Sequence, residues 1–222
     1  MRPLILLVLA GSLLAEGDSE KPKKPPPLRE RLTKAMQTVR GFRADFTQEK
    51  KLRVFKQPVT SSGVLLFERP DRMRWETRKP FRSLLVVNGK EVAKFEWVDG
   101  KRRALKLGRG ADALLVAMNR LRAWFTGKFD ESAFSIESKE EPELKLILRP
   151  KDKAIQARID RLEFYPAKDL KSMRRVVIVE TGGDVTTLRF THHKANEPAP
   201  KNTFSTSDPA ELDAKPGADK DE

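Results

Sequence analysis

Short runs of alternating apolar and polar residues constrain the fold of this chain more than any other feature of its sequence. In 42–50 (FRADFTQEK) the apolar residues Phe42, Ala44 and Phe46 occupy every second position, and similar runs recur as far as residue 191. Dipeptides typical of hairpin turns, such as Asn88-Gly89, Asp99-Gly100 and Gly182-Gly183, separate several of these runs. Because short strands joined by tight turns pair antiparallel, the pattern predicts a mainly β (α+β) fold.

About eleven strands and two amphipathic helices are expected from the periodicity. The helices are expected at 28–39 and 111–125, where apolar residues recur at intervals of three and four. The expected strands are 42–50, 59–69, 72–78, 82–87, 91–98, 102–107, 132–137, 143–149, 157–164, 173–180 and 184–191. So many strands predict a strongly curved sheet.

Each predicted strand has one apolar side and one charged side. In 91–98, for example, Ala93, Phe95 and Trp97 share one side of the strand. Two helices are small against such a sheet, because a helix covers a strip only about 10 Å wide. The remaining apolar surface either closes into a filled barrel or stays open as a cavity under helical lids. The periodicity leaves both interpretations open.

The beginning of the chain is typical of a secretory signal peptide. Arg2 precedes an apolar run at 3–14 that is too short to span a bilayer. Cleavage is expected after Gly17, with cleavage after Ala15 as the alternative, so the protein is expected in the periplasm. The expected divisions are a signal peptide (1–17), a proline-rich linker (18–27), one folded domain (28–206) and a flexible tail (207–222).

Residue types argue against an enzyme. The chain has no cysteine, which excludes disulfides, thiolate zinc sites and cysteine nucleophiles. Its two histidines, His192 and His193, are adjacent, and neighbours on a strand point to opposite faces, so they cannot act together there. Neither a nucleophile-elbow motif nor a phosphate-binding loop is present. No catalytic residue, metal or cofactor is expected.

The formal net charge of +13 favours anionic partners. Nucleic acid is not expected as a partner, because the aromatic and basic residues alternate onto opposite strand faces. Five basic residues and three acidic ones near them are expected on a solvated outer strand face, the acids as surface ion pairs. They are Arg72, Arg74, Arg78, Lys79 and Arg82, with Glu68, Asp71 and Glu76.

Several motifs in a fixed order resemble the LolA family of outer-membrane lipoprotein carriers. They are 42–48 (FRADFTQ), 63–65 (GVL), 69–75 (RPDRMRW), Pro80, 85–89 (LVVNG), 146–150 (LILRP) and 203–204 (TF). The N-terminal motifs are specific in order and spacing, and the resemblance extends over 28–206. It implies a half-barrel of about eleven antiparallel strands with helices covering the concave face as a lid.

The resemblance also implies a function without catalysis. LolA-type carriers take the acyl chains of lipoproteins from an inner-membrane ABC exporter and deliver them to an outer-membrane acceptor, and a monomer is expected. The open alternatives are a LolA-like carrier of another lipid, such as a glycolipid, and an envelope sensor on the same fold. Arg69 matches the family arginine that hydrogen-bonds lid carbonyls and latches the empty lid.

The positions expected to line the lipid cavity are apolar or aromatic. Met73 matches a large apolar residue at the cavity mouth of the family, and Trp75 and Trp97 are assigned to the wall, with core packing as the alternative. The full expected set is Phe46, Leu66, Met73, Trp75, Leu85, Phe95, Trp97, Leu114, Met118 and Leu146.

Overall fold

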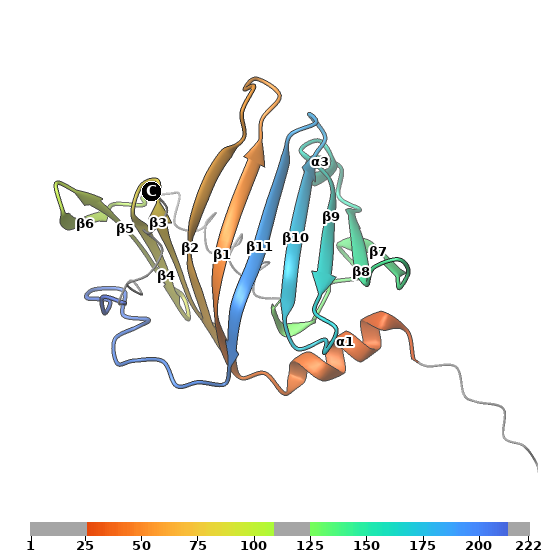
Figure 1. Cartoon of the computed structure of the whole chain (residues 1–222), viewed down its shortest axis with the longest axis horizontal. Coiled ribbons are helices and arrows are strands. Elements are labelled where there is room, and N and C mark those ends of the chain that lie inside the picture. Colours follow the sequence, from red (N-terminus) through yellow and green to blue (C-terminus); the bar gives the residue numbers. More distant parts are fainter. Residues whose placement is uncertain (1–25, 109–124, 213–222) are drawn as a thin grey trace, which may run out of the picture.

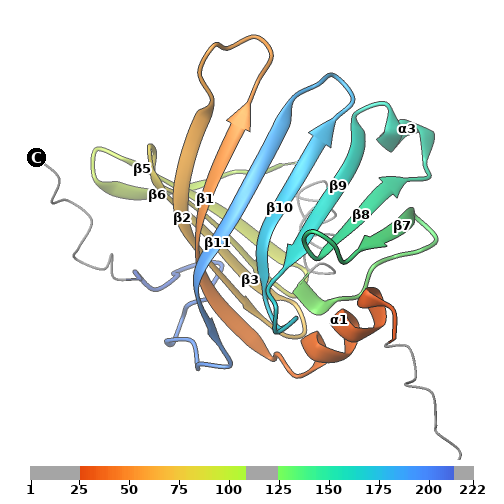
Figure 2. The ribbon, with the colours of Figure 1, turned by 45° about the vertical axis from the view of Figure 1, so that its right-hand side comes forward.

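A single antiparallel sheet of eleven strands forms the body of the computed structural model, which describes residues 26–108 and 125–212. The strand order is β6-β5-β4-β3-β2-β1-β11-β10-β9-β8-β7, so β1 and β11 lie side by side at the centre (Figure 1). Figure 2 shows the sheet strongly curved, with helix α1 across one end. The sequence prediction of a curved, mainly β fold is confirmed.

Most strands follow the predicted ranges closely, and β5 and β10 coincide with them. The first six strands are β1 (Gly41–Lys51), β2 (Val59–Glu68), β3 (Arg72–Lys79), β4 (Ser83–Asn88), β5 (Glu91–Val98) and β6 (Lys101–Leu105). The others are β7 (Phe134–Lys139), β8 (Lys145–Pro150), β9 (Ile159–Pro166), β10 (Met173–Glu180) and β11 (Val185–Ala195).

The hairpin turns explain why the register is so well determined by local sequence. Asp99 and Gly100 both have positive φ, 51° and 72°, as a two-residue type I′ turn requires. Gly63 has a different role, because a Cβ at this position would lie 1.9 Å from the carbonyl oxygen of Glu76 on β3. Glycine in the GVL motif therefore permits close contact between the β2 and β3 backbones.

Two of the helices are α1 (Leu28–Gln37) and the short α3 (Lys153–Gln156). The sequence predicted α1 but not α3, a single turn whose first N–H groups are capped by Asp152, which accepts from the N–H of Ile155. The predicted helix at 111–125 lies outside the described residues, apart from its last residue, Phe125, which is helical and buried. No helix of the described residues is long and apolar enough to cross a membrane.

A first apolar cluster occupies the concave side of the sheet. It joins side chains from β1–β4 with side chains from β8–β11, and α1 packs into it through Leu28, Leu32 and Met36. All three are at most 2% exposed. Helix α1 is therefore a cover whose apolar stripe is fully used against the concave face.

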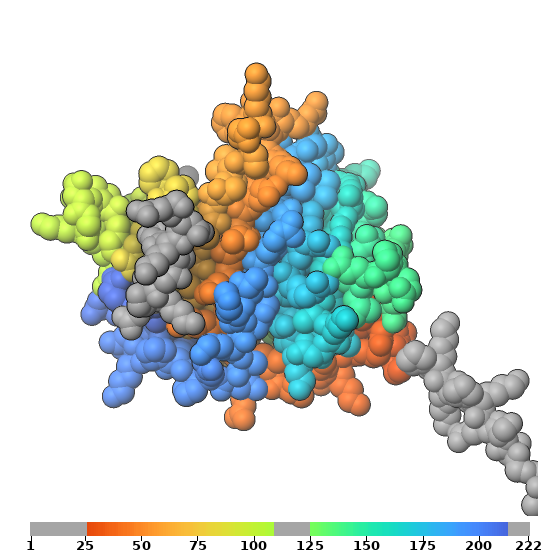
Figure 3. Space-filling view, viewed as in Figure 1, coloured from red at the N-terminus to blue at the C-terminus, as the bar shows by residue number. Residues whose placement is uncertain are grey.

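A second apolar cluster lies on the outer side of β2–β5. Residues 199–212, here called the C-terminal strap, cover it with Phe204 and Leu212 (Figure 3, blue at the lower left). Both side chains are 6% exposed. The packed part of the chain thus extends to Leu212, past the expected boundary at 206.

The strap changes the environment of the charged strand positions. The sequence analysis expected Arg74 and Glu76 on a solvated face, and this was wrong, because both side chains are 0% exposed under the strap. Arg74 Nη2 donates to Glu76 Oε2 (2.7 Å), and Arg74 Nη1 donates to the carbonyl oxygen of Thr203 on the strap (3.2 Å). The strap comes from the far end of the chain, so local alternation could not reveal it.

Candidate functional site: the concave face and its cover

Five of the expected cavity residues lie on the concave side. Phe46, Met73 and Leu146 belong to the concave cluster and are 2%, 3% and 0% exposed. Trp75 is half-buried, and its ring centroid lies 4.6 Å from that of Phe46. Leu85 is half-buried and pairs with Trp75 across β3 and β4. These side chains form a continuous apolar surface from β1 to β4, with Leu146 on β8.

Three expected residues lie on the other side of the sheet. Leu66, Phe95 and Trp97 belong to or pack against the outer cluster. The sequence showed correctly that neighbouring residues alternate, but it did not show which side was concave. On β5 the residue that contacts the concave cluster is Val92. The aromatic side of β5 therefore faces the strap and does not contribute to the concave surface.

The two remaining expected residues, Leu114 and Met118, lie outside the described residues. Within the described part, the sequence analysis missed an aromatic group at the end of the concave face nearest α1. Phe125 makes ring contacts with Phe42 (5.0 Å), Phe67 (6.1 Å) and Phe190 (6.1 Å). The alternation of strand sides could have placed two of these rings, because Phe67 lies on the same side of its strand as Leu65, and Phe190 on the same side as Leu188.

Arg69 ties the β2–β3 turn to the end of α1. Its Nε donates to the carbonyl oxygen of Val39 (2.7 Å) and its Nη2 to that of Met36 (3.1 Å). Its backbone N–H donates to the carbonyl oxygen of Arg40 (2.8 Å). The last carbonyls of a helix lack partners within the helix, and the forked guanidinium supplies donors to the end of α1 and to the residues just after it.

The described residues between α1 and β10–β11 are tightly packed. Met36, Phe42, Phe125 and Phe190 line a pocket of about 10 Å³ there, which has room for about one water molecule. Beside it, the Nε2 atom of His193 lies 2.9 Å from the carbonyl oxygen of Met173. Burial lowers the pKa of His193, against the opposing effect of that hydrogen bond. The lid is thus closed over this part of the concave face.

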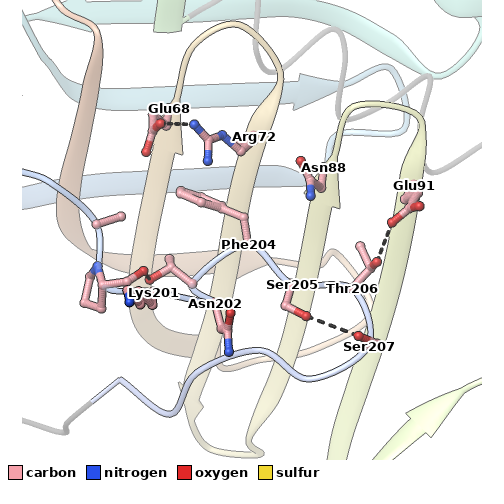
Figure 4. A pocket seen from close by; sticks show the side chains of 13 residues that line it. Glu68, Arg72, Asn88, Glu91, Lys201, Asn202, Phe204, Ser205, Thr206 and Ser207 are labelled. Carbon is pink, nitrogen blue, oxygen red and sulfur yellow. Dashed lines mark hydrogen bonds and ion pairs between the residues drawn. The ribbon is translucent and has the colours of Figure 1, made fainter.

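A larger pocket, of about 530 Å³, lies between the strap and the ends of β2–β5 (Figure 4). Its walls are mainly polar: Arg72 pairs with Glu68, and Thr206 Oγ1 donates to Glu91 Oε2 (2.6 Å). Such walls suit water and polar groups better than acyl chains. Among the described residues no group of acidic or histidine side chains could hold a metal ion.

The fold and the covered concave face place the molecule in the class of open antiparallel half-barrels with a helical lid. The chain is LolA-like: the family model "Outer membrane lipoprotein carrier protein LolA" matches residues 37–108. A curated relative from Dechloromonas aromatica, named outer-membrane lipoprotein carrier protein, is 26% identical over 80% of this chain and 82% of its own length. One of the same name from Nitrosomonas europaea is 27% identical over 96% and 97%. The resemblance seen in the sequence is confirmed.

Solved structures give only distant matches. A LolA superfamily protein from Nitrosomonas europaea is 9% identical, with a TM-score of 0.42, over 81% of this chain and 98% of its own. MucA/MucB of Pseudomonas aeruginosa matches with 17% identity and a TM-score of 0.40, over 79% of this chain and 58% of the matched chain. These scores are too low to support a functional inference.

Proposed function

We propose that this protein is a periplasmic carrier that holds the acyl chains of lipoproteins against its concave face and delivers them from an inner-membrane exporter to the outer membrane. The observation that carries the proposal is the closed cover: α1 lies on an apolar concave surface and is held at its end by Arg69. The names of the curated relatives point to the same cargo.

The concave surface has the chemistry that acyl chains need. Each methylene removed from water contributes about 0.8 kcal/mol, so a carrier gains affinity by offering apolar area rather than specific polar contacts. Phe46 and Trp75 supply flat aromatic area. Met36 and Met73 supply flexible side chains that adapt to chains of variable shape.

Cargo entry requires α1 to move, because its buried side chains occupy the surface that the cargo would use. Leu28, Leu32 and Met36 would leave the concave cluster and acyl chains would replace them, so the apolar exchange is close to neutral. The two side-chain hydrogen bonds of Arg69 are lost on opening and regained on release. They bias the empty carrier toward the closed state and thereby favour release.

This function needs no chemical step and no cofactor. The carrier proceeds through binding, opening and closing alone, and we propose no enzymatic activity. We propose that secretion to the periplasm uses the predicted signal peptide. The exporter and acceptor stay proposals that follow from the family resemblance.

The test compares Arg69→Leu with Arg72→Leu, a neighbouring arginine that pairs with Glu68 at the surface. Arg69→Leu is expected to fold and load but to retain its cargo, because the closed empty state loses its latch. Arg72→Leu is expected to release cargo like the wild type. Native mass spectrometry of protein from the periplasm would measure bound acylated species, and normal release by Arg69→Leu would contradict the latch.

The same spectra would distinguish lipoprotein from glycolipid cargo. The net charge of +13 gives a physical reason to keep an anionic glycolipid as the alternative, because its headgroup would be attracted to the basic surface. Masses that fit acylated proteins would support the first cargo, and masses that fit lipids alone would support the second. Protein that carries no apolar species and excludes a fluorescent lipid probe would overturn both.

A further inference from the structure

Exposed apolar side chains gather at one end of the sheet. Strands of an antiparallel meander alternate in direction, so the β1–β2, β3–β4 and β5–β6 turns lie at the same end, here called the tip end. Six large apolar side chains are exposed in the described residues, and five lie at the tip end. These five are Val54 (84%), Phe55 (58%), Val59 (49%), Phe81 (84%) and Val98 (42%).

Basic residues surround these apolar side chains. In 49–59 Lys50, Lys51, Arg53 and Lys56 stand against a single acid, Glu49. The β3–β4 connection at 78–82 has three bases and no acid, and 99–103 has three bases and one acid. Lys50, Arg82 and Arg102 pair with acids of other segments, yet the described residues at the tip end still have more bases than acids. The tip end therefore combines exposed apolar side chains with a net positive charge.

The β1–β2 turn is held in a defined shape. The N–H of Phe55 donates to the carbonyl oxygen of Leu52 (2.9 Å), which closes a turn. Arg53 fixes this turn to the β10–β11 turn: its N–H donates to Asp184 Oδ1 (2.9 Å) and its Nη1 to the carbonyl oxygen of Gly182 (3.0 Å). The turn projects beyond the neighbouring strands (Figures 1 and 3).

We propose that the tip end docks on an anionic lipid surface, with Val54 and Phe55 entering the interfacial layer and the bases contacting lipid phosphates. Apolar residues flanked by Lys and Arg are the composition of segments that lie in a membrane interface. The apolar side chains lie on or beside three separate turns and not on one continuous strand face, so they suit a soft lipid surface better than a folded partner. This docking does not rest on the proposed carrier function, because it needs no cargo.

The first test is sedimentation of the full chain with vesicles. Vesicles that contain phosphatidylglycerol are expected to bind the protein, and vesicles of phosphatidylcholine alone are expected to bind it far more weakly. Val54→Ser/Phe55→Ser should lower the partition onto anionic vesicles by about tenfold or more, and Phe81→Ser by a smaller factor. Leu105→Ser is the matched control, because Leu105 is exposed (38%) but lies at the other end of β6.

The second test separates local charge from net charge. Lys56→Glu changes the tip end, and Lys90→Glu makes the same change at the β4–β5 turn, at the opposite end of the strands. Each basic residue near an anionic surface is worth roughly fivefold in binding, so Lys56→Glu should lower the partition at least that much. Lys90→Glu should have little effect.

Several results would overturn the docking proposal. These are a wild-type protein that does not bind anionic vesicles at low salt, a Val54→Ser/Phe55→Ser variant that binds equally well, and equal losses in the two lysine variants. If the tip end binds an acidic protein and not a lipid surface, the wild-type protein will not sediment with anionic vesicles. Circular dichroism and thermal unfolding would check folding, and the exposed positions make unchanged melting temperatures the expected result.

Discussion

The two sides of the sheet are covered in different ways. On the concave side, α1 covers an apolar surface, and the side chain of Arg69 fixes its end through two hydrogen bonds. On the outer side, the C-terminal strap covers a second apolar surface and a buried ion pair, and Arg74, Arg82 and Arg102 fix it through hydrogen bonds and ion pairs. A cover held by a few hydrogen bonds can open at modest cost, whereas a cover over a buried charge cluster cannot. The two covers therefore differ in role: the concave cover can open, whereas the outer cover stays in place.

The outer charge cluster explains this difference. Glu76 accepts from Arg74 (2.7 Å) and from Arg82 (3.1 Å), and it is 0% exposed. Burial lowers the pKa of Arg74, while the hydrogen bond from its guanidinium to Glu76 opposes this effect. Arg82 also pairs with Glu211 on the strap, and its guanidinium lies 3.9 Å from the Trp97 ring centroid. Because Arg78 Nε also lies 3.7 Å from Glu76 Oε1, one carboxylate compensates three arginines beside the strap.

The largest expected effect tests whether the outer cover is structural. Glu76→Ala removes the partner of a fully buried arginine, and such a loss destabilises a protein by about 3–5 kcal/mol. Glu96→Ala is the control, because Glu96 pairs with Lys94 (3.1 Å) in an exposed position and should cost less than about 1 kcal/mol. Urea unfolding would measure both. A cost for Glu76→Ala no larger than the control would show that the cluster does not hold the strap.

The second prediction separates the two sides by ligand binding. Trp75 lies on the concave side and Trp97 on the outer side. Trp75→Ala is expected to weaken binding of a fluorescent fatty-acid probe roughly tenfold, because it removes apolar area from the proposed site. Trp97→Ala is expected to lower stability, through the lost contact with Arg82, and to leave probe affinity unchanged. Equal losses of affinity in the two variants would contradict the assignment of the ligand to the concave side.

This comparison also shows what the sequence could and could not predict. Each strand carries its own alternation and its own turn residues, so β5 and β10 were predicted with their observed bounds. Arg69 could be singled out because its motif is local. The side of each strand could not be assigned, because burial of Phe95 and Trp97 depends on the strap, more than a hundred residues further along the chain. Arg74 and Glu76 resembled a surface pair for the same reason.

The smallest expected effect concerns pH and the concave side alone. His193 lies beside the α1 contact, and burial lowers its pKa; the Met173 carbonyl and Asp169 oppose this shift, and His192 adds to it. When a group has a lower pKa in the folded state than in the unfolded chain, its stabilising contribution is complete at pH values above the unfolded pKa. For His193 that unfolded pKa is 6.5. That contribution is lost as the pH falls from there through the folded pKa, because the unfolded chain then binds the proton more readily.

The free energy of unfolding of the wild type should therefore fall more steeply than that of His193→Gln between about pH 7 and about pH 5. Urea unfolding at several pH values would measure the difference, and His192→Gln is the control, because the His192 side chain is 77% exposed. If the closed cover depends on neutral His193, binding of the fatty-acid probe should change with pH in the same window in the wild type and not in His193→Gln. Parallel pH curves for these two proteins would show that His193 does not couple protonation to the concave cover, and the contrast with the outer side would then rest on Arg69 alone.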